Sequence, residues 1–189
     1  MIDKDGTEIF YTPGEVNCLG DVVKNVGVKG EIIEVGVYKG GSAKVIAGHF
    51  KDRIVHLFDT FTGFPNDIDF KNGDAEWYKE GDMKEANIEL VKKNLSKFKN
   101  IEFHKGRFPD TADVIKGKIA FAHIDVDIYT GTKEALEFIY PKMVKGGSIV
   151  IHDYPAHKGV ENAVNNFLED KEHKIEILGV EGRQGIIKI

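Results

Sequence analysis

Short apolar runs alternate along this chain with segments in which apolar residues recur every three or four positions. The runs are rich in β-branched and aromatic residues, and we expect buried strands at residues 31–36, 53–59, 101–104, 118–125 and 148–151. The segments between and before them have the period of amphipathic helices, at residues 15–26, 41–50, 84–98, 130–140 and 158–168. Such repeats are typical of βαβ units, so the sequence predicts a mainly parallel sheet covered by helices.

The end of the chain follows a different pattern. Two strand-like runs, residues 174–180 and 184–189, are separated only by Glu181-Gly182-Arg183. This turn leaves no room for a crossover helix, so the two strands are expected to pair as an antiparallel hairpin. The predicted fold class is α/β, a Rossmann-like doubly wound sheet that is mostly parallel and closed by a C-terminal antiparallel hairpin.

We expect residues 1–189 to form one domain, because no Pro- or Ser-rich linker and no internal repeat divides the chain. Residues 1–30 form an N-terminal helical segment in this prediction. Residues 64–81 are polar and rich in Gly and Asp, which favours an active-site loop in which Trp77 and Tyr78 cover a ligand. The alternative is an ordered surface loop held in place by the two aromatic residues.

The composition of the chain excludes some classes of binding partner. The 26 Lys and Arg against 31 Asp and Glu give a net charge of −5, with no long basic run, which argues against nucleic acid or an anionic membrane as a partner. Cys18 is the single cysteine, so no disulfide can form within the chain. The start of the chain has no apolar stretch of the kind that export signals carry. We therefore expect a cytoplasmic protein that acts on a small molecule.

The first predicted strand runs into a glycine-rich turn, Glu34-Val35-Gly36-Val37-Tyr38-Lys39-Gly40-Gly41-Ser42. Such a strand-to-helix turn lets a ligand approach the backbone closely. The spacing is ExGxxxG rather than the GxGxxG of dinucleotide sites, and Glu34 would repel a diphosphate. The turn therefore favours a nucleoside without pyrophosphate, and Glu34 suits the sulfonium and amino group of S-adenosylmethionine. A purely structural turn is the alternative.

Asp59 ends the second predicted strand, 23 residues after Gly36. An acidic residue at about this interval binds ribose hydroxyls in nucleoside sites. Asp59 could instead cap a helix that begins at Thr60.

Carboxylates also follow the fourth and fifth predicted strands, in His123-Ile124-Asp125-Val126-Asp127 and His152-Asp153-Tyr154. Ligands of open α/β sheets bind at this edge of the sheet. Asp125 and Asp127 are two residues apart and repel each other on one side of an extended chain, which favours a bound cation. The alternative is a helix cap at Asp127 and a solvated Asp153.

Taken together, these motifs resemble the macrocin O-methyltransferase family of S-adenosylmethionine-dependent class I methyltransferases. The matching stretches cover most of the chain from about residue 31 to residue 170, and they are residues 34–42, 58–65, 105–111, 123–129 and 140–154. The resemblance implies an O-methyltransferase that methylates a hydroxyl of a sugar or another small molecule. It also makes a homodimer plausible.

The resemblance further implies roles for single residues. Asp127 matches the general base, whereas Asp125 and Asp153 match ligands of a divalent metal, usually magnesium. The third ligand position is His152 where the family has Asp, and imidazole suits manganese, iron or zinc better than magnesium. The expected cofactor contacts are Thr12, Glu34, Gly36, Tyr38, Asp59, Thr60, Gly63, Gly106, Arg107 and Asp125.

Several alternatives remain open from the sequence. His152 is the second candidate for the base if no metal binds, and His123 lies near the site without an assigned role. His49, His56, His104, His157 and His173 are expected to have structural or surface roles. The other function classes are an NAD-dependent oxidoreductase and a nucleoside-binding protein without catalysis.

Overall fold

One mixed sheet organises the computed structural model, which describes residues 11–65, 70, 72–74, 78–180 and 182–189. In the described part of the chain the sheet has seven strands in the order β3-β2-β1-β4-β5-β7-β6. They are β1 (Glu31–Val35), β2 (Val55–Asp59), β3 (Ile101–Lys105), β4 (Ile119–Ile124), β5 (Met143–His152), β6 (Ile175–Leu178) and β7 (Gln184–Lys188). β1 to β5 are parallel, and β7 runs antiparallel between β5 and β6. The predicted doubly wound sheet and C-terminal hairpin are confirmed.

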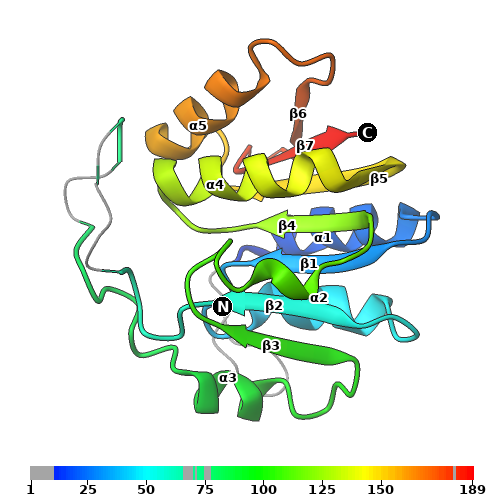
Figure 1. Ribbon diagram of the computed structural model, residues 1–189, viewed down its shortest axis with the longest axis vertical. Coiled ribbons are helices and arrows are strands. Elements are labelled where there is room, and N and C mark those ends of the chain that lie inside the picture. Colours follow the sequence, from blue (N-terminus) through cyan, green and yellow to red (C-terminus); the bar gives the residue numbers. More distant parts are fainter. Residues whose placement is uncertain (1–10, 66–69, 71, 75–77, 181) are drawn as a thin grey trace.

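Helices cover both faces of this sheet (Figure 1). They are α1 (Pro13–Asn25), α2 (Gly41–His49), α3 (Ile88–Asn94), α4 (Tyr129–Ile139) and α5 (Lys158–Leu168), with short 3₁₀ turns η1 (Ala112–Val114) and η2 (Tyr140–Lys142). α4 packs beside α5 and α1 packs beside α2. Two hydrophobic cores result, one on each face, because each parallel strand is apolar on both sides.

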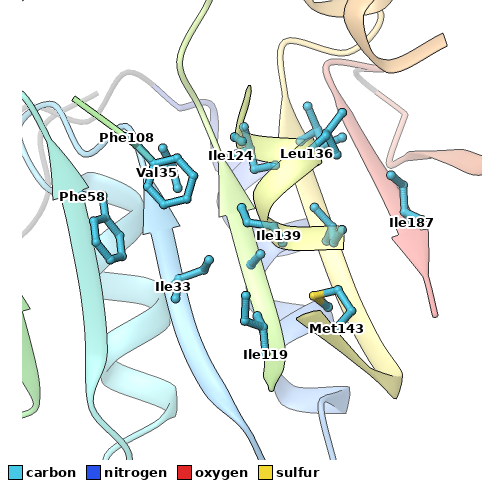
Figure 2. Close-up of a cluster of buried hydrophobic side chains, with 14 of the residues drawn as sticks. Ile33, Val35, Phe58, Phe108, Ile119, Ile124, Leu136, Ile139, Met143 and Ile187 are labelled. Carbon is cyan, nitrogen blue, oxygen red and sulfur yellow. The ribbon is translucent and has the colours of Figure 1, made fainter. Parts of the chain in front are cut away.

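Figure 2 shows the core on the α4 and α5 face. Ile33, Phe58 and Ile124 project from three strands and are almost fully buried, and Leu136 and Ile139 of α4 pack on them. Burial of such side chains stabilises the fold by about 1.5–3 kcal/mol each. The rigid layer that they form fixes where the carboxyl ends of the strands lie.

Two predicted elements differ most in length from the structure. The helix predicted at residues 84–98 is only α3, because the Asn87 side chain accepts a hydrogen bond from the Leu90 amide and caps a later start. The strand predicted at residues 148–151 is longer at both ends. Its first residue, Met143, pairs with Ile119 of β4, and its last, His152, pairs with Gln184 of β7.

The N-terminal segment contains α1, which begins with a capping box. The Thr12 hydroxyl accepts from the Glu15 amide, and the Glu15 carboxylate accepts from the Thr12 amide. Residues 1–10 of the predicted segment lie outside the described residues. None of the described helices is long and apolar enough to cross a membrane.

The predicted loop at residues 64–81 is described only in part, and Trp77 lies outside the described residues. Tyr78 packs edge-on against Phe64, with ring centroids 5.2 Å apart. Asp74 accepts a 2.7 Å hydrogen bond from the amide of Tyr129, the first residue of α4. This part of the loop is therefore fixed to the N-terminus of α4.

Candidate active site

A cavity of about 370 Å³ opens at the carboxyl ends of β1, β2, β4 and β5. The described parts of the segment that follows β2 lie along this edge of the sheet (Figure 1). The cavity is lined by Tyr11, which precedes α1, by residues of the turns after these strands and by Arg183 of the C-terminal hairpin. It has the position that ligands take in open α/β sheets.

The turn after β1 forms the first wall of the cavity. Gly36 has a φ of +83°, and a Cβ atom there would lie 1.7 Å from the carbonyl oxygen of Asp125. Only glycine allows the ends of β1 and β4 to approach so closely. Tyr38 also lines this wall and donates a 2.6 Å hydrogen bond to Glu85.

Asp59 holds this turn in shape. One carboxylate oxygen accepts from the amides of Val37 at 2.8 Å and Tyr38 at 3.1 Å, and the other accepts from the amide of Phe61 at 2.7 Å. No helix begins at Thr60, so the helix-cap alternative is wrong. Asp59 lines the cavity, and its contact with ribose stays a prediction.

Glu34 lies below the turn rather than in its wall. Its side chain is fully buried and contacts Nδ1 of His123 at 3.0 Å. Burial raises the pKa of Glu34, although His123 partly offsets this effect. The next two residues, Val35 and Gly36, line the cavity, whereas Glu34 is not among the described lining residues. His123 thus serves as the partner of Glu34.

The other residues expected to contact the cofactor divide into two groups. Thr60, Gly63, Gly106 and Arg107 line the cavity as predicted, and Arg107 is fixed by a 2.7 Å ion pair with Glu134. Thr12 caps α1 and is not among the described lining residues, whereas its neighbour Tyr11 is.

The predicted metal ligands do come together. Nδ1 of His152 lies 3.4 Å from an Asp125 oxygen and 3.3 Å from an Asp153 oxygen. Nε2 of the same ring lies 3.3 Å from Glu15. Burial disfavours the imidazolium, but the three surrounding carboxylates outweigh it and raise the pKa of His152 to about 12.

Asp125 and Asp127 have opposite electrostatic environments. Burial favours a neutral Asp125, but His152 outweighs it and holds the pKa of that carboxyl well below its usual range. Burial, together with the charges of Asp125 and Asp153, raises the pKa of Asp127. Asp127 also has a φ of +61° and does not cap α4, whose N-cap is Ile128. The helix-cap alternative for Asp127 is therefore wrong.

Four residues of the site were not predicted from the sequence. The Tyr11 hydroxyl donates to Asp125, and the Arg183 guanidinium donates to Asp153. Glu15 faces His152, and its pKa is lowered to about 2 because His152 outweighs the effect of burial. The fourth residue, His157, lines the cavity, where the sequence led us to expect only a structural or surface role.

Sequence spacing could have indicated only one of these residues. His157 follows Asp153 by four positions, and its Nδ1 atom lies 3.3 Å from that carboxylate. Tyr78, which was predicted to cover a ligand, lies 3.2 Å from the same nitrogen. The other three residues are distant in sequence from the strands that they meet.

The strand order, the glycine turn and the acidic groups at the carboxyl edge define a class I methyltransferase fold. The family model for macrocin-O-methyltransferase (TylF) matches residues 15–183. The chain belongs to this family, and the resemblance inferred from the sequence is confirmed. It is thus an S-adenosylmethionine-dependent O-methyltransferase, and the oxidoreductase and non-catalytic alternatives are wrong.

Individual relatives agree with this assignment. The chain is 26% identical over 182 residues to demethyldecarbamoylnovobiocin O-methyltransferase of Streptomyces niveus, covering 89% of this chain and 69% of that protein. It is 29% identical over 187 residues to mycinamicin III 3''-O-methyltransferase of Micromonospora griseorubida, covering 90% and 72%. Among solved structures, the O-methyltransferase NovP has a TM-score of 0.73 at 23% identity, covering 92% of this chain and 78% of that one.

Proposed function

We propose that this enzyme transfers the methyl group of S-adenosylmethionine to a hydroxyl of a sugar or a similar small molecule, with Asp127 as general base and a divalent metal assisting. The observation that carries the proposal is the arrangement of the cavity, where Asp127 and the cluster of Asp125, His152 and Asp153 lie beside the nucleoside-type turns. Two relatives are named for antibiotic substrates, demethyldecarbamoylnovobiocin and mycinamicin III, which supports a small hydroxylated acceptor.

In this mechanism the acceptor hydroxyl lies between Asp127 and the sulfonium of the cofactor. The oxygen attacks the methyl carbon, the carbon–sulfur bond breaks, and the hydroxyl proton passes to the Asp127 carboxylate. Burial and two neighbouring carboxylates raise the pKa of Asp127, which makes it a stronger proton acceptor than a solvated carboxylate. Removal of the proton in this way typically contributes about 10²–10⁴ in rate.

The residues present fit a divalent metal. Both ring nitrogens of His152 are buried and have no hydrogen-bond partner of acceptable geometry among the described residues. Nδ1 and the nearest oxygens of Asp125 and Asp153 lie within 4.8 Å of one another, which is close enough for one ion. A nitrogen and two oxygens suit manganese, iron or zinc better than magnesium. A bound ion would polarise the acceptor oxygen and lower the pKa of its hydroxyl.

Without a metal, the positive charges that balance the carboxylates of this cluster come from protein side chains. His152 stays protonated among the carboxylates, and the Arg183 guanidinium contacts Asp153. An imidazolium has no free lone pair and cannot accept the hydroxyl proton. The pKa of His152 therefore argues against this residue as the base and leaves the role to Asp127.

The test compares Asp127→Asn with Asp125→Asn on an acceptor found by screening hydroxylated sugars. Asp127→Asn removes the proton acceptor, and turnover should fall by roughly two to four orders of magnitude while cofactor affinity stays unchanged. Asp125→Asn should weaken metal binding, and added metal should restore part of the rate. Isothermal titration and initial rates at several metal concentrations measure both effects. Near wild-type turnover of Asp127→Asn at saturating metal would show that the base is another residue.

A further inference from the structure

A second group of metal-ligating side chains lies outside the cavity, on β2 and β3. Nδ1 of His56 lies 3.0 Å from Nε2 of His104 and 3.6 Å from a carboxylate oxygen of Glu102. One ligand atom from each of the three residues falls within 4.8 Å of the others. None of the three is among the described residues that line the cavity.

The sheet itself brings these residues to one place. His56 is the register partner of Glu102, and His104 follows Glu102 by two residues. Since side chains alternate across a strand, all three project from the same face of the sheet. His104 is further fixed by Phe58, whose ring stacks on its imidazole with centroids 4.5 Å apart and planes inclined by 23°. The donors therefore stand on a rigid platform.

A fourth residue favours one tautomer of His56. Nε2 of this ring faces the carboxylate of Glu31 on β1 at 3.5 Å. A proton on Nε2 would be attracted to that carboxylate, which leaves Nδ1 with a lone pair aimed at His104 and Glu102. Histidine ligands of metals have this arrangement, because a carboxylate commonly accepts from the ring nitrogen that does not bind the ion.

Access and burial also differ among the donors. The His56 side chain is 11% exposed and that of Glu102 is 54% exposed. One side of the cluster is therefore anchored in the protein, and the other is open to solvent. An ion could enter past Glu102, and solvent could provide the remaining ligand of a four-coordinate site.

We propose that His56, His104 and Glu102 form a binding site for a transition-metal ion such as Zn²⁺, with Glu31 supporting His56. Two imidazole nitrogens and one carboxylate oxygen select zinc-like ions over magnesium or calcium, which take oxygen ligands. The ion would link edge strand β3 to β2. Its ligand His104 lies two residues before Gly106, which lines the cavity. The proposal does not depend on the acceptor or on the metal of the active site.

The experiment measures zinc bound per chain after equilibrium dialysis, using the full chain with His152→Gln to remove the active-site imidazole. The His152→Gln variant should retain one equivalent of Zn²⁺ per chain, and the additional substitution His104→Gln should abolish this zinc binding. His49→Gln, on the exposed end of α2, is the matched control and should retain the equivalent. Glu31→Gln should weaken binding about 10–100-fold, as loss of such a supporting carboxylate typically does.

A second variant distinguishes loss of the zinc site from misfolding. Glu102 is largely exposed, so Glu102→Gln should keep the far-ultraviolet circular dichroism of the parent while losing most of its zinc affinity. The proposal is overturned if the His152→Gln protein binds no zinc, or if the His104→Gln and Glu102→Gln variants bind as tightly as the His49→Gln control. In that case the short contact between His56 and His104 is a hydrogen bond between the two rings.

Discussion

At the residue scale, the site places four carboxylates around two cationic side chains. Glu15, Asp125 and Asp153 surround His152, and Arg183 contacts Asp153 from the hairpin. Asp127 lies beside this group and forms no ion pair with the described residues, and its pKa is raised. The same cluster thus keeps some carboxylates ionised and gives another the basicity that proton removal requires.

His152 can be tested through metal preference. His152→Asp replaces a cation by a fifth carboxylate in the site, so the free energy of unfolding of the metal-free protein should decrease. Magnesium should then stabilise the variant, by about 2.7 kcal/mol at 100 times its dissociation constant. Thermal unfolding with and without Mg²⁺ measures this effect, and His152→Gln is the control for loss of the ring alone. Equal responses of the two variants to Mg²⁺ would contradict the proposed ligand position.

Asp59 has a structural role and a predicted binding role, which one substitution can separate. Asp59→Ala leaves three backbone amides without their acceptor, which should lower the free energy of unfolding by about 1–3 kcal/mol. If Asp59 also contacts ribose, the wild type should prefer 5′-methylthioadenosine to its 2′-deoxy analogue, and the variant should lose that preference. Titration calorimetry with both ligands, on the wild type and on the variant, measures this preference. A preference that survives the substitution would leave Asp59 with the structural role only.

At the scale of elements, the turn between β1 and α2 depends on one glycine. Gly36→Ala puts a Cβ atom 1.7 Å from the Asp125 carbonyl oxygen in a backbone conformation with positive φ. Strain and overpacking should together cost roughly 2–6 kcal/mol and abolish cofactor binding. Gly27→Ala is the matched control, because nothing lies within 4 Å of its Cβ position. Urea unfolding should show a change within about 1 kcal/mol for the control; similar losses in both variants would contradict the argument.

The elements were largely predictable because their signals are local. Buried parallel strands such as β4 are continuous apolar runs, and the acidic residues that follow β4 and β5 mark the ligand-binding edge. The helix predicted at residues 84–98 was too long because the apolar periodicity begins before the Asn87 cap and continues after the last residue of α3, Asn94. Tyr11 and Arg183 could not be predicted, since they reach the cavity from the segment before α1 and from the hairpin through tertiary packing alone.

At the scale of the whole molecule, the cavity is assembled from distant parts of the chain. Tyr11 precedes α1 and Arg183 precedes β7, yet both contact carboxylates that follow central strands. The two cores on either side of the sheet hold these parts in register. A ligand in the cavity would therefore add further contacts between these distant segments, and its binding should be visible as global stabilisation.

The last prediction uses that coupling to identify the cofactor. S-adenosylmethionine at 100 times its dissociation constant should raise the free energy of unfolding by about 2.7 kcal/mol. For a chain of 189 residues this corresponds to a rise in Tm of roughly 5–11 °C, at about 2–4 °C per kcal/mol. S-adenosylhomocysteine should also stabilise, whereas NAD at equal concentration should not, because the turn after β1 lacks the glycine pattern that accommodates a pyrophosphate. Differential scanning calorimetry with the three ligands measures the shifts, and the Gly36→Ala variant should show none of them. A shift with NAD equal to that with S-adenosylmethionine would mean that the turn does not discriminate against diphosphate.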